Sequence, residues 1–263
     1  MIKIKIPPKK NRKFIENFFI EKKLGFLVTE SKKDRFASDK TYMPRLDDLF
    51  NLYQYIVLNK RTTIFEFGSG WSSLIFSLAL QELKNKFSEE IRFLRRSNPF
   101  ELFILENEKK FLKITKRKLD SFTKKNDIKI KIHYCFSTVK MIKYNGNIAS
   151  EYTKLPLCNP DFVYVDGPDQ FNILGNINGI NIGHKDMMPM ICDPLKFEYF
   201  YTPGTIILTD GRAANAKFLR DNFKRKWIYY NLKKNDQHIF YLNDNTLGKY
   251  NSRQLKFYKS KSL

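Results

Sequence analysis

The sequence predicts an α/β protein whose mostly parallel, doubly wound sheet of seven strands ends in an antiparallel hairpin. Three observations lead to this fold class. Between residues 62 and 242, short β-branched and aromatic runs alternate with amphipathic helical stretches. Several runs, such as DFVYVD at 161–166, are almost continuously apolar, which is typical of strands covered on both faces. A polar turn, Lys233-Lys234-Asn235-Asp236, joins the last two strands and predicts a hairpin.

Residues 1–60 are predicted to form a helical N-terminal extension. Residues 1–13 are basic and carry Pro7-Pro8, which favours an extended arm. Apolar residues at helical spacing predict one helix over 14–27, and a polar loop follows at 31–40. A second helix is predicted at 47–58, with Asp47 and Asp48 in its first turn, where carboxylates suit the helix dipole.

The main domain is predicted at 61–246, and its strands follow from the apolar runs. They are expected at 62–67, 100–106, 128–135, 161–166, 205–210, 226–231 and 237–242, with helices at 72–85, 108–124 and 213–223. The insertion at 169–203 is long for a crossover connection, so we expect a lid and substrate wall there, with 187–200 packed as a helix. Residues 247–263 are predicted to form a basic C-terminal tail.

Composition limits the classes of protein that fit. Hydrophobic residues make up 42% of the 263-residue chain and aromatic residues 15%, enough for a sizeable core. Three scattered cysteines suggest neither a disulfide framework nor a zinc site. The sequence has no membrane span and no secretory signal, so we expect a cytoplasmic protein.

The chain is strongly basic. Its net charge is +21, from 48 Lys and Arg against 27 Asp and Glu. Because the lysines are spread along the whole chain, a solvated lysine-rich surface explains the charge; a nucleic-acid partner bound through that surface is the alternative.

The stretch from Thr62 to Leu80 carries the strongest functional signal. A short strand ends at Glu66, a Gly68-Ser69-Gly70 turn follows, and a helix opens with Ser72 and Ser73. Glycine permits backbone conformations and close approaches that a Cβ would block. The free N–H groups of a helix start favour an anionic or strongly polar ligand group. This arrangement predicts a cofactor cradle.

The segment EFGSG at 66–70 resembles the E/D-x-G-x-G motif of the class I S-adenosylmethionine (SAM)-dependent methyltransferases, which have a Rossmann-like fold. The resemblance implies SAM as the cofactor. It implies that Glu106, at the end of the second strand, binds the ribose hydroxyls. Where the family often has an acid to meet the adenine amine, this chain has Phe136 and Ser137, which could stack on the ring and contact it.

Two further carboxylates are predicted to follow strands at the same edge of the sheet, where ligands of open α/β sheets bind. Asp166, which the resemblance places near the cofactor's ammonium group, is also a candidate general base, and Asp210 occupies the analogous position after the next strand. The pair could also bind Mg²⁺. However, the magnesium-dependent subgroup carries Asp-Asn where this chain has Asp210-Gly211, so a metal is not favoured.

Candidates for the acceptor side come from loops. His184, Lys185 and Asp186 lie in the long insertion, with His184 as a candidate acid–base group. Tyr42 and Arg45 precede the second helix and could close the pocket from the other side. Arg212, two residues after Asp210, is a further candidate for substrate binding or a salt-bridge partner of Asp210.

These features predict a SAM-dependent methyltransferase acting on a hydroxyl of a small molecule or sugar. DGPD at 166–169 replaces the N-P-P-Y type of tetrapeptide, which lowers the expectation of base N-methylation. Three alternatives stay open: an RNA methyltransferase using the basic surface, an NAD-dependent Rossmann enzyme, and a binding module without catalysis. The absence of a third glycine after Gly70 counts against the NAD enzyme.

Overall fold

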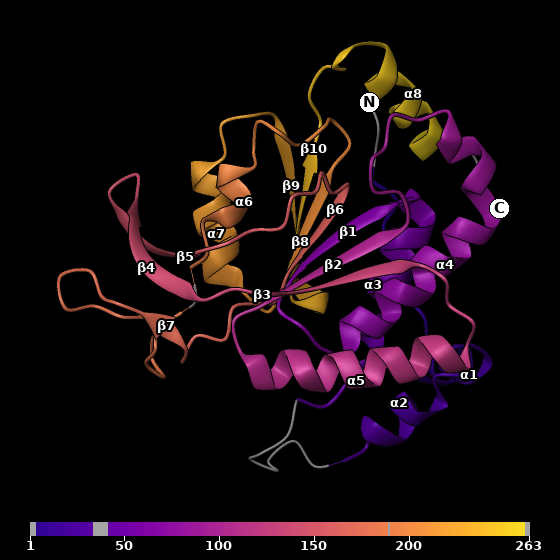
Figure 1. Cartoon of the computed structure of the whole chain (residues 1–263), viewed down its shortest axis with the longest axis horizontal. Helices are drawn as coiled ribbons and strands as arrows, with labels where there is room; N and C mark the ends of the chain where they lie inside the picture. Colours follow the sequence, from indigo (N-terminus) through magenta and orange to yellow (C-terminus); the bar gives the residue numbers. More distant parts are fainter. Residues whose placement is uncertain (1–3, 34–41, 189, 261–263) are drawn as a thin grey trace.

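The computed structural model describes residues 4–33, 42–188 and 190–260, built around one seven-stranded sheet (Figure 1). The strand order is β3-β2-β1-β6-β8-β10-β9. In that order the bounds are Lys131–Phe136, Glu101–Glu106, Thr63–Phe67, Phe162–Val165, Ile206–Asp210, Gln237–Leu242 and Trp227–Leu232. β10 runs antiparallel to both of its neighbours, β8 and β9, and the other neighbouring pairs of this sheet are parallel. The predicted fold class is confirmed, with strand bounds shifted by a few residues.

Successive residues of each central strand point to opposite faces of the sheet and enter two separate cores. Ile64 and Leu102 belong to one core, and Phe65 and Phe103 belong to the other. Both faces of the parallel strands are therefore buried, and this explains why their sequences are almost continuously apolar.

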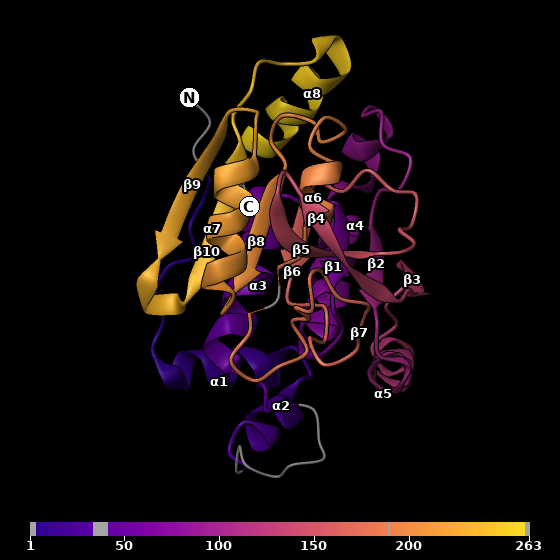
Figure 2. The same ribbon diagram turned by 90° about the vertical axis from the view of Figure 1, so that its left-hand side faces the viewer.

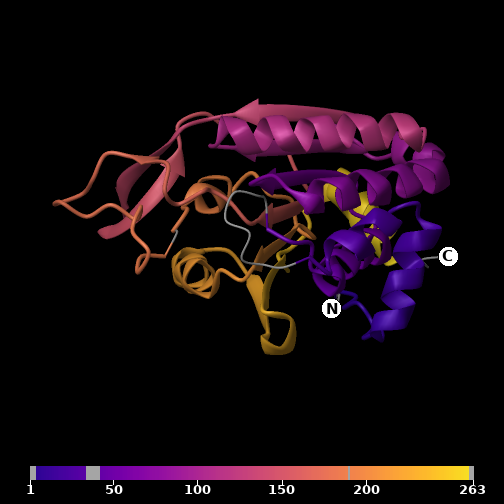
Figure 3. The same ribbon diagram turned by 90° about the horizontal axis from the view of Figure 1, so that it is seen from below.

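The two faces are covered by different kinds of structure, as Figures 2 and 3 show. On one face lie α3, Leu46–Asn59; α4, Trp71–Arg92; α5, Lys109–Lys125; and α8, Gly248–Lys259. On the other lie α6, Asp193–Lys196, and α7, Ala213–Asn222, with a small sheet of β4, Val139–Tyr144, β5, Asn147–Tyr152, and β7, Ile173–Leu174.

The small sheet was not predicted, although one signal for it is present in the sequence. Asn145 and Gly146 join β4 to β5 and have φ angles of 47° and 79°. Asn-Gly with two positive φ angles is the preferred two-residue hairpin connection. The hairpin occupies the connection between β3 and β6.

Three other expectations need correction. The helix predicted over 14–27 is two helices, α1, Arg12–Glu21, and α2, Gly25–Glu30, because Lys23 between them has a left-handed φ of 58°. The helix predicted over 187–200 is reduced to the four residues of α6. The basic segment 247–263 contains α8, whose Leu255 and Tyr258 are buried in the core.

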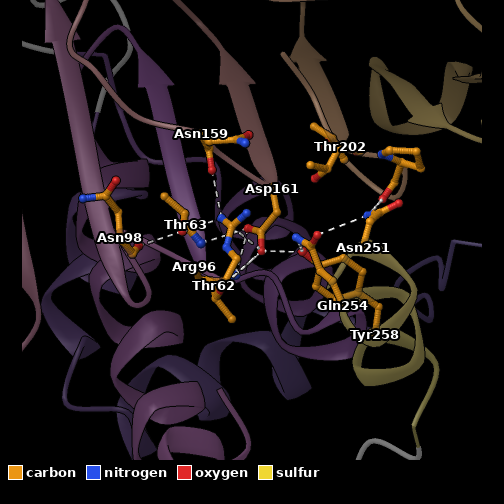
Figure 4. A network of polar contacts seen from close by, with 12 residues as sticks. Thr62, Thr63, Arg96, Asn98, Asn159, Asp161, Thr202, Asn251, Gln254 and Tyr258 are labelled. Carbon is orange, nitrogen blue, oxygen red and sulfur yellow. Dashed lines mark hydrogen bonds and ion pairs between the residues drawn. The ribbon is translucent and has the colours of Figure 1, made fainter. Parts of the chain in front are cut away.

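A buried polar network holds α8 against the amino ends of the strands (Figure 4). Asp161, immediately before β6, accepts hydrogen bonds from the backbone N–H groups of Thr62 and Thr63 and from the hydroxyl of Tyr258 on α8, at 2.7 to 3.0 Å. The guanidinium of Arg96 lies 3.7 Å from the same carboxylate. The network ties the C-terminal helix to the starts of β1 and β6, at the edge opposite the candidate site.

Among the helices of the described residues, none combines the length and apolar character that crossing a membrane requires.

Candidate functional site

The candidate site lies at the carboxyl ends of β1, β2, β6 and β8, which are adjacent in the sheet. Its framework is a backbone contact between the turns that follow β1 and β6. A Cβ placed on Gly68 would lie 2.8 Å from the Gly167 nitrogen, and Gly68 has a φ of 99°. Both features require glycine at position 68.

Glu66 is enclosed by the helix start that it precedes. Its side chain is 1% exposed, and its two carboxylate oxygens accept hydrogen bonds from the hydroxyls of Ser72 and Ser73, the latter at 2.6 Å. Burial raises the pKa of Glu66 to about 8, against the lowering effect of the two serines. Ser73 also accepts from the Gly70 N–H at 3.4 Å, but the short bonds of both serines go to Glu66. Glu66 therefore binds the first turn of α4 through the hydroxyls of both serines.

Glu106 is linked directly to the same glycine turn. The Ser69 hydroxyl donates to one carboxylate oxygen at 2.7 Å, and the N–H groups of Asn107 and Glu108 donate to the other at 2.8 and 3.0 Å. Burial raises the pKa of Glu106. The turn after β1 and the end of β2 thus form one hydrogen-bonded unit, as their adjacency in the sheet allows.

The two residues predicted for the adenine have different surroundings. Phe136 is 39% exposed at the end of β3, and the Lys109 ammonium lies 4.9 Å from its ring centroid. Ser137 is buried; its hydroxyl accepts from the Lys154 N–H at 2.9 Å and contacts Thr153. Phe136 is therefore open to a ligand, whereas Ser137 is engaged with the end of the β4–β5 hairpin.

Asp166 is the most accessible of the strand-end carboxylates, with its side chain 55% exposed. The Arg212 guanidinium is 3.9 Å from it and donates to the backbone carbonyls of Asp166 and Pro168. The Nη1 atom of Arg212 is buried and has no hydrogen-bond partner among the described residues. Arg212 thus pairs with Asp166, and the predicted salt bridge to Asp210 is not formed.

Asp210 ends β8 beside a carboxylate from the N-terminal extension. The hydroxyl of Tyr164 donates to Asp210 at 3.3 Å. Burial, and next the nearby carboxylates of Asp48 and Asp166, raise the pKa of Asp210 to about 8. Asp48 is 5% exposed, and burial raises its pKa to about 7. Three carboxylates from different elements therefore influence one another here.

Of the two acceptor-side residues predicted before α3, one faces the cluster. Arg45 binds Asp48 through Nε at 2.7 Å, and its charge lowers the pKa of Asp210. Tyr42 is 94% exposed; its backbone carbonyl accepts from the Trp71 indole at 2.8 Å.

The candidates in the long insertion contact one another and the loop that carries them. His184, Lys185 and Asp186 are exposed, and the His184 Nδ1 atom accepts from the Asp186 N–H at 3.2 Å. The His184 carbonyl accepts from the Gln170 side chain at 3.0 Å. The structure does not bring His184 into a hydrogen bond with Asp166 or Asp210.

A magnesium site finds no support in the donor set. Across the described ranges, no three His, Cys, Asp or Glu side chains are grouped so that they could hold a metal ion.

The strand order β3-β2-β1-β6-β8-β10-β9 agrees with the arrangement expected from the sequence. Five parallel strands followed by an inserted antiparallel strand are the arrangement that the EFGSG resemblance implies.

Comparisons with known proteins give distant structural neighbours. No family model matches the sequence, and no curated protein matches it. The O-methyltransferase from Bacillus cereus in complex with SAH is 13% identical, with a TM-score of 0.40, and the match covers 87% of this chain and 94% of that one. The O-methyltransferase TomG from Streptomyces achromogenes, involved in tomaymycin synthesis and in complex with SAM, is 13% identical, with a TM-score of 0.39 and coverages of 91% and 92%.

Sequence reasoning missed two residues of this site. Asp48 was read only as a first-turn helix acid, and nothing in a single helix indicates that its N-terminal turn reaches β8. Asn107 joins two strand-end loops: its side chain donates to the Asp169 and Asn172 carbonyls and accepts from the Asp169 N–H, at 2.8 to 3.1 Å. The position of Asn107 directly after Glu106 is the feature of the sequence that indicates a place in the site.

Proposed function

We propose that this protein is a SAM-dependent methyltransferase that modifies a hydroxyl group of a small molecule or sugar. The observation that carries the proposal is the link between the glycine turn and Glu106 through the Ser69 hydroxyl, within the class I strand order. It puts a carboxylate with oriented oxygens beside a turn that lacks side-chain bulk.

The charge of the site fits the cofactor. Glu106 and Asp166 lie at the ends of neighbouring parts of the sheet, at one edge of a chain whose net charge is +21. A sulfonium and an ammonium group are both cationic, and carboxylates bind such groups and ribose hydroxyls well. We assign Glu106 to the ribose, the exposed ring of Phe136 to the base and Asp166 to the ammonium group. When bound, SAM supplies a methyl group on a positively charged sulfur.

Two orphaned atoms support a hydroxylated acceptor. Asp48 Oδ1 and Arg212 Nη1 are both buried, and neither has a hydrogen-bond partner among the described residues. Buried polar atoms are nearly always paired in native proteins, with protein, water or ligand. One is an acceptor and the other a donor, and a hydroxyl group can pair with either kind.

Asp210 is the group we assign to proton removal. A general base works best when its pKa lies near the working pH, and the pKa of Asp210 is raised to about 8 by burial and by the neighbouring carboxylates. The Tyr164 hydroxyl donates a hydrogen bond to this carboxylate, and the charge of Arg45 lowers its pKa. The exposed loop with His184, Lys185 and Asp186 remains our candidate for the outer wall of the acceptor site.

Calorimetric titration with SAM, SAH and NAD tests the proposal. We expect SAM and SAH to bind one-to-one and NAD not to bind. Transfer of labelled methyl from SAM to a panel of hydroxylated small molecules, with RNA as a parallel arm, then identifies the acceptor class. Failure of both sulfur nucleotides to bind would contradict the proposal. Transfer of the labelled methyl group to RNA alone would mean that the acceptor is RNA and not a small molecule.

A further inference from the structure

A second pocket opens on the helical side of the glycine turn, away from the carboxylates. Its volume is about 410 Å³, and it lies between α2, the start of α4 and the second half of α5. Small-molecule sites commonly occupy about 300–1,000 Å³. None of Glu66, Glu106, Asp166, Asp210 or Asp48 lines it. Its one link to the candidate cofactor site is Trp71, the residue after Gly70.

Aromatic rings form the wall of this pocket. The rings of Phe26 and Trp71 have centroids 6.3 Å apart and planes inclined at 49°, and Phe26 is 44% exposed. Phe122 of α5 is buried behind them. Two partly open rings at this separation can contact a planar ligand by edge and face.

The charged residues of the pocket are mostly cations. Lys23, Lys118 and Lys125 line it, and none of them forms an ion pair with a carboxylate of the described residues. The only acid in the lining, Glu30, is paired with Lys33 instead. The charge of Glu30 also raises the pKa of Lys118 against the effect of burial, but one carboxylate that is shared with Lys33 faces three lysines of the lining.

Lys118 joins the aromatic and cationic parts. Its ammonium lies 3.6 Å from the centroid of the Trp71 ring, an attractive cation–π geometry. Burial lowers its pKa, so its charged form is short of solvation. An anion beside this ammonium would compensate for the solvation that burial removes.

We propose that this pocket binds an aromatic anion, with its ring against Trp71 and Phe26 and its acidic group at Lys118. The site is separate from the proposed cofactor site and does not depend on the methyltransferase proposal.

Calorimetry with phenyl phosphate tests the inference on the full chain, with phenol and inorganic phosphate as separate arms. We expect saturable one-to-one binding of phenyl phosphate, and at least tenfold weaker binding of phenol and phosphate. Fluorescence of Trp71 should change with the same midpoint; the only other tryptophan, Trp227, stacks on Phe223 at 4.6 Å and should not respond.

Variants locate the binding. Lys118→Gln should weaken phenyl phosphate binding at least tenfold, and Lys125→Gln, at an exposed position, should weaken it less. The matched control is Lys116→Gln on the same helix, where the native lysine is paired with Asp120 at 2.9 Å outside the pocket. Saturating SAH should leave the affinity unchanged. Absence of saturable binding, equal binding of inorganic phosphate, or equal effects of the Lys116 and Lys118 variants would each overturn the inference.

Discussion

Gly167 and Gly68 meet backbone to backbone between the turns that follow β6 and β1. A Cβ built on Gly167 would lie 2.5 Å from the Gly68 nitrogen and 2.7 Å from its Cα. These neighbours are main-chain atoms, so they cannot give way by changing a rotamer. The contact fixes the distance between the turn that follows Glu66 and the loop that carries Asp166.

Gly167→Ala should therefore destabilise the protein. We expect a loss of about 2 kcal/mol or more in the free energy of unfolding, because overpacking forces the backbone to shift. Urea unfolding followed by circular dichroism measures it. Gly25→Ala is the control, since its Cβ would meet only the Ile20 side chain at 3.5 Å and that backbone at 3.9 Å. Equal free energies of unfolding for the two variants would show that the contact between Gly68 and Gly167 does not constrain the backbone.

Glu106→Gln should weaken SAM binding without unfolding the protein. Gln keeps the shape but loses the charge that strengthens hydrogen bonds to ligand hydroxyls, so we expect a loss of at least about tenfold, or about 1.4 kcal/mol. Glu101→Gln is the matched control, because Glu101 lies at the opposite end of the same strand and contacts His133. Calorimetry on both variants decides; an unchanged Kd for Glu106→Gln would remove Glu106 from the cofactor site.

Glu66 should make stability depend on pH. Its pKa is about 8 when folded and 4.5 ordinarily, so between these values the unfolded chain releases a proton that the folded protein keeps. The free energy of unfolding should thus fall as pH rises, by up to about 1.4 kcal/mol per pH unit for this group. Glu66→Gln should flatten the curve between pH 5 and 7.5, and Glu21→Gln, at an exposed helix position, should not. Parallel curves for wild type and Glu66→Gln would contradict the assignment.

The central sheet was predictable because each parallel strand is a continuous apolar run, and the positions of Glu66, Glu106, Asp166 and Asp210 follow from the strand ends. Adjacent parallel strands must end at one edge, so their terminal carboxylates necessarily gather. Local patterns suffice for this part of the site.

What the sequence did not predict depends on contacts between distant segments. The position of Asp48 beside Asp210 is set by how α3 packs on the sheet. The hydroxyls of Ser72 and Ser73 bind Glu66 because that carboxylate is buried, which no local pattern reveals. The packing of α8 depends on a hydroxyl, Tyr258, that reaches a carboxylate 97 positions away.

Asp161 should be the most sensitive polar residue of the amino-end network. Its side chain is fully buried and accepts bonds from Thr62, Thr63 and Tyr258 beside the buried Arg96 guanidinium (Figure 4). Asp161→Asn would leave Arg96 without its counter-charge and point an amide N–H at backbone N–H groups, so we expect a loss of about 3–5 kcal/mol.

Tyr258→Phe tests the hydrogen bond that anchors α8 while the charge of Asp161 is kept. It removes the hydrogen bond to the Asp161 carboxylate, worth about 1.5–3 kcal/mol, and the bond that the hydroxyl accepts from the Gln254 side chain. It keeps the ring that lies 3.8 Å from the Arg61 guanidinium. Asp127→Asn is the control, because Asp127 and its partner Lys129 are both exposed and such pairs contribute about 0–1 kcal/mol. Denaturant unfolding should rank the losses Asp161, Tyr258, Asp127 in decreasing order. Because the network lies at the edge opposite Glu106, the folded fraction of each variant should keep its SAM affinity; a parallel loss of affinity would mean that the two edges are coupled.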